Sequence, residues 1–202
     1  MKTIAAVAAF VAASAFCHQA MAATYLKQAF DANYALTSPA LGNGSMRIES
    51  DGKGHVRTET ICPATGKITS VTDYIEKKVS TVMDKQKMIM TAELSDNNVN
   101  VFDEESAKKA GYKGLGAKNI DGHPCHGFEI DSKVPGGKTV STEEWIGDDT
   151  HYLVHSETTT PQGKQITALK KWSNSAPGDI TKLPADYKEM KVPAQKPPKA
   201  QK

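Results

Sequence analysis

The sequence is poor in cysteine, arginine and aromatic residues. Its 202 residues include three Cys, two Trp and 6% aromatic side chains, and Arg occurs only at Arg47 and Arg57. So few Cys and dispersed His residues do not supply the four ligands of a structural zinc site. The sequence also lacks a P-loop, a zinc-protease helix and a Ser-His-Asp signature. We therefore expect no enzyme activity, no catalytic residue, no metal site and no cofactor.

Long apolar runs are missing as well, apart from a short one near the N-terminus. The apolar run from Ile4 to Phe16 follows Lys2 and precedes Ala20-Met21-Ala22. A membrane span needs about 20 apolar residues, whereas a shorter run before a small-x-small motif is typical of a secretory signal. We predict that residues 1–22 are a cleaved signal peptide and that the mature protein is periplasmic, with no integral membrane segment.

An excess of one charge is absent from the body of the chain. Of 25 Lys+Arg and 23 Asp+Glu, Lys2 and four lysines in 191–202 lie outside residues 23–190, which therefore carry a net charge of −3. A body of this charge is not expected to bind nucleic acid. The segment 191–202 is rich in Pro and Lys, so we predict a disordered basic tail. A weaker interpretation is that this tail contacts an anionic membrane or cell-wall surface.

Two cysteines remain after cleavage, Cys62 and Cys125. An even number of Cys in an oxidising compartment is typical of a disulfide. A bond between them would close a loop of about 60 residues and stabilise the fold by roughly 4 kcal/mol in the chain-entropy model. We predict this disulfide.

Residues 23–190 are expected to form a single domain of short strands. Segments rich in Thr, Val and Ile are separated by turn signals every 8–12 residues, which is typical of an antiparallel meander. "FDANYAL" places Phe30, Ala32, Tyr34 and Leu36 on one face, and "DGKG" is a strong turn signal. "DEESAKKAG" predicts one short helix at about 104–110. The fold class is therefore mainly β, with one or two short helices.

The stretch "NIDGHPCHGFEID" places His123, Cys125 and His126 within four positions. Asp121-Gly122 is a good two-residue hairpin turn, and a strand is expected to begin at about Cys125. Neighbours on a strand point to opposite faces, so Cys125 and His126 diverge. We therefore interpret this stretch as a turn and a strand and do not assign it a metal or a Cys-His nucleophile.

A copper site is a further alternative. Met88 and Met90 share one face of a predicted strand, with Met83 nearby, and thioethers suit Cu(I). The same residues equally suit an apolar strip, because Met fills irregular cores. Cu or Zn binding is therefore the least favoured of our hypotheses.

The order of several motifs resembles a group of secreted bacterial proteins of unassigned function. The motifs are "MRIESDGKGHVRTET", "VTDYIEKKVSTVMDKQKMIM", "AKNIDGHPCHGFEI", "TEEWIGDD" and "LPADYKEM". This group is similar to the periplasmic lipoprotein carriers of the LolA/LolB type. The resemblance implies a strongly curved antiparallel sheet, a half-open barrel, over about residues 28–190. The low aromatic content and the two arginines depart from the carriers, so no cargo residue is transferred.

Our hypothesis from the sequence is a non-catalytic, monomeric periplasmic protein. It would bind or carry an apolar or amphiphilic molecule, such as a lipid or a lipoprotein acyl chain, in its concave face. The alternative is an envelope protein-interaction or stress accessory factor that uses the sheet edge and the basic tail. The ligand-binding residues themselves are not predicted.

Overall fold

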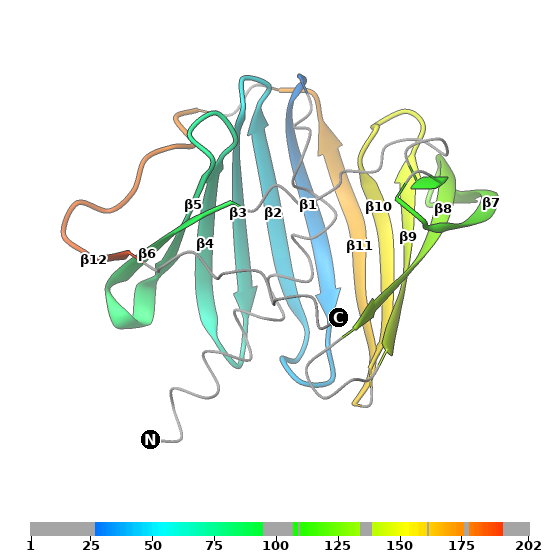
Figure 1. The fold of residues 1–202 in the computed structure, drawn as a ribbon, viewed down its shortest axis with the longest axis horizontal. Coiled ribbons are helices and arrows are strands. Elements are labelled where there is room, and N and C mark those ends of the chain that lie inside the picture. Colours follow the sequence, from blue (N-terminus) through cyan, green and yellow to red (C-terminus); the bar gives the residue numbers. More distant parts are fainter. Residues whose placement is uncertain are drawn as a thin grey trace, which may run out of the picture.

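One sheet of twelve strands dominates the part of the chain that the computed structural model describes, residues 27–94, 107–108, 110–133, 139–160, 162–175 and 178–191. The strand order is β12-β6-β5-β4-β3-β2-β1-β11-β10-β9-β8-β7. The first and last strands of this order lie at opposite ends of a curved, unclosed sheet (Figure 1). The predicted half-open, mainly β fold is therefore confirmed.

The strands follow the chain as hairpins, with two departures from simple neighbour pairing. β1 pairs with both β2 and β11, so the N-terminal strand lies in the middle of the sheet. β12 pairs with β6 in parallel, although all the other pairs are antiparallel. The strand bounds are β1 Ala29–Thr37, β2 Gly44–Asp51, β3 His55–Cys62, β4 Gly66–Asp73, β5 Lys78–Met83, β6 Met88–Glu93, β7 Lys113–Ile120, β8 His123–Lys133, β9 Thr139–Gly147, β10 Leu153–Thr160, β11 Gly163–Ser173 and β12 Lys188–Lys191.

Apolar alternation fixes which face of β1 and β2 is buried. Phe30, Ala32 and Tyr34 are buried on β1, and Met46 and Ile48 are buried on β2. The residues between them are more exposed. Successive side chains of a strand point to opposite faces, so the buried residues share one side of the sheet. We call this side the inner face. The face assignment predicted for β1 is confirmed.

The strand register carries the inner face across most of the sheet. Paired residues of neighbouring strands point to the same face, so a chain of pairs defines a row. The row that passes through Tyr34 crosses seven strands and contains a single polar residue, Thr60. It consists of Leu169, Tyr34, Met46, Thr60, Ile68, Met83 and Met88.

The structure adds strands that the sequence did not predict. β7 forms a hairpin with β8 through the predicted turn at Asp121-Gly122, and β8 begins at His123 rather than at about Cys125. β12 was not expected either, because Lys188–Lys191 shows no alternation and all four residues are exposed.

Helical structure is sparse among the described residues. A single 3-10 turn spans Asp84–Gln86, between β5 and β6. Of the helix predicted at about 104–110, residues 107–108 are helical and most of the rest lies outside the described residues. In the described part of the chain, no helix is long and apolar enough to cross a membrane.

The predicted signal peptide at 1–22 and nearly all of the predicted tail at 191–202 also lie outside the described residues. Both stay predictions, as does the single-domain assignment of 23–190.

Candidate functional site

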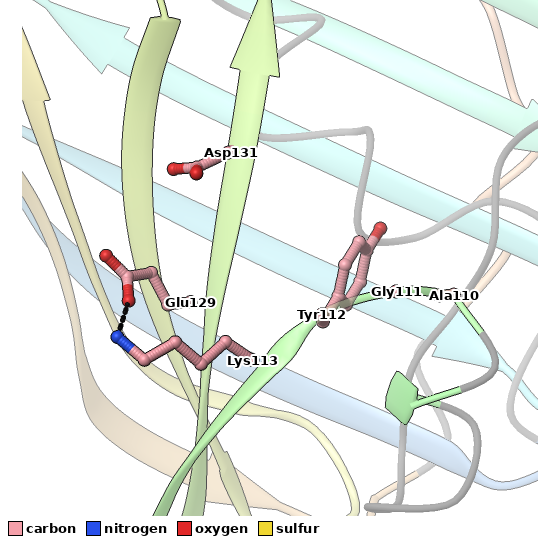
Figure 2. A pocket seen from close by; sticks show the side chains of 6 residues that line it. All are labelled: Ala110, Gly111, Tyr112, Lys113, Glu129 and Asp131. Atoms are coloured by element: carbon pink, nitrogen blue, oxygen red, sulfur yellow. Dashed lines mark hydrogen bonds and ion pairs between the residues drawn. The ribbon is translucent and has the colours of Figure 1, made fainter.

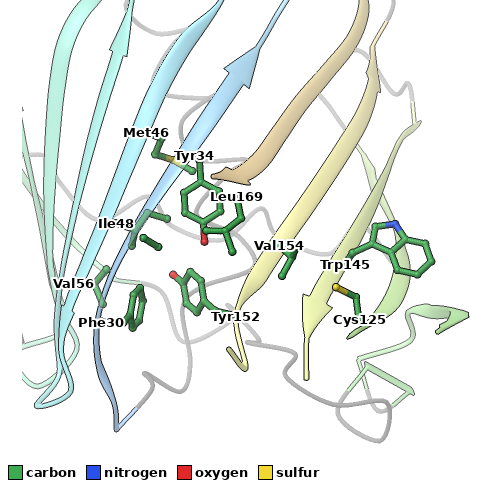
Figure 3. Packing of buried hydrophobic residues seen from close by; sticks show 11 residues of the cluster. Phe30, Tyr34, Met46, Ile48, Val56, Cys125, Trp145, Tyr152, Val154 and Leu169 are labelled. Atoms are coloured by element: carbon green, nitrogen blue, oxygen red, sulfur yellow. The ribbon is translucent and has the colours of Figure 1, made fainter. Parts of the chain in front are cut away.

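The centre of the inner face is filled by aromatic side chains. Phe30 is 1% exposed, its ring stacks on Trp172 at a centroid distance of 4.6 Å, and it meets the ring of Tyr152 at 4.7 Å. Figure 3 shows the side chains of β1, β2 and β3 pointing toward those of Tyr152 and Leu169. Tyr152 directly precedes β10, which is not a neighbour of β1, so its contact with Phe30 requires a curved sheet. The centre is therefore a packed core.

Tyr34 links this centre to β10. Its hydroxyl donates a hydrogen bond to the carbonyl oxygen of Leu153 at 2.8 Å, passing over β11. Burial raises the pKa of the Tyr34 and Tyr152 hydroxyls far above the usual range, and that of Tyr74 to about 12. These phenols are neutral at physiological pH, so they supply hydrogen bonds and apolar surface without charge.

The inner face is more open over β4, β5 and β6, which we call the arm. Its apolar side chains continue the Tyr34 row but are only partly buried, with the exception of Met83, which is buried. Ser70 and Thr81, which lie among the apolar residues, pair their hydroxyls at 3.4 Å. The half-buried apolar residues of the arm are Ile68, Val79, Met88, Met90 and Ala92.

A carboxyl group lies at the other end of the inner face. The register places Leu36, Thr167, Ser156, Glu144 and Phe128 in one row from β1 to β8. Phe128 itself packs with Ala107 and Ile146 in a small second core. Loss of solvation in this apolar setting raises the pKa of Glu144 to about 7. The inner face therefore contains a carboxyl group that titrates near neutral pH.

The histidines of the β7–β8 hairpin do not form a common site. His123 Nδ1 lies 2.8 Å from Asp149 Oδ2, and His126 Nδ1 lies 2.6 Å from Asp148 Oδ1. Register places Cys125 opposite Gly147 and His126 opposite Ile146, on different faces, as the sequence predicts. Among the described residues, no group of three or more His, Cys, Asp or Glu side chains is placed to hold a metal ion.

The expected disulfide is not formed in the structure, where Cys62 and Cys125 are buried free thiols. Five strands separate β3 from β8 in the sheet, and neighbouring strands are about 4.8 Å apart. A disulfide needs Cα atoms within about 7 Å, so the two residues cannot bond without a large rearrangement. Sequence reasoning failed here because it counted cysteines without knowing the strand order.

Cys125 is also unsuited to nucleophilic catalysis. Its Sγ donates to the carbonyl oxygen of His123 at 3.2 Å. Burial, followed by the charges of Asp149 and Asp148, raises the pKa of its thiol to about 11. The thiol is therefore protonated at neutral pH, whereas a nucleophile needs the thiolate.

A polar cleft of about 350 Å³ lies where β7 begins (Figure 2). Lys113 Nζ contacts Glu129 Oε2 at 2.7 Å, and Glu129 also accepts a hydrogen bond from Ser141. Two charged residues of the cleft, Lys113 and Glu129, are thus paired with one another. The lining residues are Ala110, Gly111, Tyr112, Lys113, Glu129 and Asp131. Such a lining does not suit an apolar ligand, so the inner face is the better candidate site.

Tyr152 and Glu144 were missed by sequence reasoning. They share the inner face with β1 because β11, β10 and β9 pair in succession beside β1, which connects residues more than 100 positions apart. The alternation of each strand was visible in the sequence. The order in which the strands pair was not.

No family model and no curated protein matches the chain. Solved structures do. MucB shares 15% identity at a TM-score of 0.47, with 86% of this chain and 62% of MucB covered. The MucA/MucB complex of Pseudomonas aeruginosa gives 13% identity, a TM-score of 0.49, and coverage of 82% and 59%. A LolA superfamily protein from Nitrosomonas europaea gives 10% identity, a TM-score of 0.35, and coverage of 80% and 93%.

The chain spans about three fifths of the length of the MucB structures that it matches. At such scores and identities the likeness carries nothing about activity, cargo or partners. The curved open sheet is established by the strand pairing of this chain itself.

Proposed function

We propose that this protein is a non-catalytic binding protein of the bacterial envelope that holds an apolar or amphiphilic molecule on its inner face, as a monomer. The observation that carries the proposal is the row from Leu169 to Met88, which is apolar across seven strands except at Thr60. An apolar surface that continues from a packed core into a half-buried region is typical of a ligand site.

The ligand would occupy the arm and not the aromatic centre. Phe30, Tyr34 and Tyr152 already fill the centre. Over the arm, Val79, Met88 and Met90 keep part of their surface in solvent. A bound alkyl chain would remove this surface from water, which is worth about 25 cal/mol per Å². Unbranched Met side chains can adjust to chains of different shape.

A fluorescent fatty acid titrated into the full chain tests the proposal. We expect saturable binding and its displacement by unlabelled fatty acid or phospholipid. Val79→Asp places a charge on the inner face of the arm and should weaken binding at least tenfold. Ile61→Asp is the control, because Ile61 is 47% exposed and lies on the opposite face. No saturable binding, or equal loss in both variants, would contradict an inner-face site.

The alternative, a protein-interaction role, finds support at the sheet edge. β7 ends the strand order, and most of its residues are exposed. An exposed edge strand can accept a strand from a partner. Pull-downs from envelope extract with and without residues 191–202, and with Ala117→Pro on β7, distinguish this role. A partner that is lost with either change would favour it over ligand carriage.

A further inference from the structure

Four methionines from two distant parts of the chain lie side by side on the inner face of β5, β6 and β12. Met83 lies directly opposite Met88, and Met90 follows Met88 by two positions, on the same face. The parallel pairing of β12 with β6 then places Met190 directly opposite Met90. We call these four residues the methionine patch. Met46 is the one other methionine beyond residue 22.

The spacing of the patch allows its sulfur atoms to converge. Residues directly opposite one another on paired strands have Cβ atoms about 4.5–5.5 Å apart, and diagonal neighbours lie about 7–8 Å apart. Met side chains are unbranched and have three rotatable bonds. Three thioethers on such a grid can therefore turn toward one point above β6. The grid is set by backbone pairing, so it does not depend on particular rotamers.

Burial across the patch is graded. Met83 is 5% exposed and anchors one end, Met88 and Met90 are half-buried, and Met190 is 44% exposed. The sulfur atoms at the exposed end can thus be reached from solvent, whereas the Met83 end is closed to it. A patch that existed only to fill the core would not leave a large apolar side chain exposed on a four-residue edge strand.

On the paired strands around the patch, a single charged residue, Lys188, shares the inner face. The register surrounds the methionines with Ile68, Thr81 and Ala92, and it places Lys188 beside Met88. On the inner face of β4, β5, β6 and β12 as described, there is no carboxylate. Hard cations such as Mg²⁺ and Ca²⁺ require oxygen ligands and would find none with charge. Lys188 is exposed, so its long side chain can move away from a bound ion.

We propose that the methionine patch binds a soft monovalent ion, Cu(I), through three or four thioether sulfurs. Thioethers select Cu(I) among biological metals, because the ligand and the ion are both soft. The site goes beyond the proposed ligand-binding role. It uses sulfur atoms specifically, whereas an alkyl chain would use any apolar side chain on the same surface.

The direct test follows the methionine methyl groups of the full chain by NMR. The protein is labelled with methyl-13C methionine and titrated without oxygen with Cu(I), or with Ag(I) as a stable soft substitute. We expect the methyl resonances of the methionine patch to shift at one equivalent, while that of Met46 stays in place. Unchanged patch resonances would overturn the proposal, and this result requires no variant.

Variants then locate the site by competition with a chromophoric Cu(I) chelator. Met88→Leu/Met90→Leu keeps the apolar volume and should lower Cu(I) affinity at least tenfold. Met46→Leu is the matched control and should retain the affinity of the unchanged protein. Affinity that survives the double variant but is lost in Cys62→Ser/Cys125→Ser would assign the metal to the thiols and contradict the proposal. Zn(II) binding of equal strength at the patch would also contradict it.

The two proposals can fail separately. Saturable fatty-acid binding together with unchanged patch resonances would contradict the metal site alone, and shifted patch resonances without fatty-acid binding would contradict the ligand site alone. Val79→Asp changes the arm without removing a sulfur and should leave the metal-dependent methyl shifts in place.

Discussion

The hydroxyl of Tyr34 on β1 donates to the carbonyl oxygen of Leu153 on β10, although β11 lies between these strands. The bond spans 2.8 Å, and Tyr34 is 2% exposed. It ties the two halves of the sheet together across the inner face. Because a flat sheet would hold β1 and β10 two strand spacings apart, the bond both depends on the curvature and helps to maintain it.

Tyr34→Phe should destabilise the fold by about 1–2 kcal/mol, because it removes a buried hydrogen bond and leaves an acceptor less satisfied. Urea unfolding followed by fluorescence measures the change. Tyr187→Phe serves as the control, since its hydroxyl bonds to Asp84 in a more exposed setting. We expect less than about 0.5 kcal/mol there. Equal effects would mean that the Tyr34 bond has no special role.

Gly127→Ala should also destabilise the protein, by roughly 1–3 kcal/mol. A Cβ atom at this position would lie 2.6 Å from two ring atoms of Trp145. The ring has little room to move, because Trp145 is 6% exposed and Lys118 Nζ of β7 lies 3.6 Å from its centroid. Gly114→Ala on β7 is the matched control, since its Cβ would meet nothing within 4 Å. Unfolding curves of the two variants that coincide would contradict this packing.

Much of this sheet could be predicted from alternation within single strands. Phe30, Ala32 and Tyr34 reveal the buried face of β1, and a period of two separates Cys125 from His126 correctly. β7 could not be recognised in this way. It lies at the sheet edge and carries Gly114 and Gly116, so no apolar alternation marks it.

The candidate site was less predictable than the strands. Met83, Met88 and Met90 lie close in the sequence, and their shared face could be expected. Met190 joins them only through a parallel pair between strands about 100 residues apart. Strand order depends on tertiary packing, which local propensity does not encode. The same limitation explains why Cys62 and Cys125 were expected to bond.

Both thiols should be found free when the unreduced protein is denatured. The structure holds Cys62 and Cys125 five strands apart. Alkylation in denaturant followed by peptide mass spectrometry should label both residues. Native protein should react slowly at both, because burial raises the pKa of each thiol. A peptide that links Cys62 to Cys125 would contradict the observed strand order.

Glu144 should make the protein less stable as the pH rises from about 5 to about 7. Loss of solvation raises the pKa of this carboxyl from 4.5 to about 7 in the folded protein. Between these values the folded state binds more protons than the unfolded state, so the free energy of unfolding falls with increasing pH. Since Glu144 keeps partial access to solvent, we expect a loss of roughly 1–3 kcal/mol, less than the full shift would give.

Glu144→Gln should remove most of this pH dependence, because the amide does not titrate, and it should raise the free energy of unfolding at pH 8. Urea unfolding at pH 5, 6, 7 and 8 measures both effects. Glu143→Gln is the control, since Glu143 is exposed and points to the opposite face of β9. If the pH slope were the same in the original protein and in Glu144→Gln, the carboxyl would be solvated in solution. The inner face near Phe128 would then be open to water, so an amphiphile could place its polar end there.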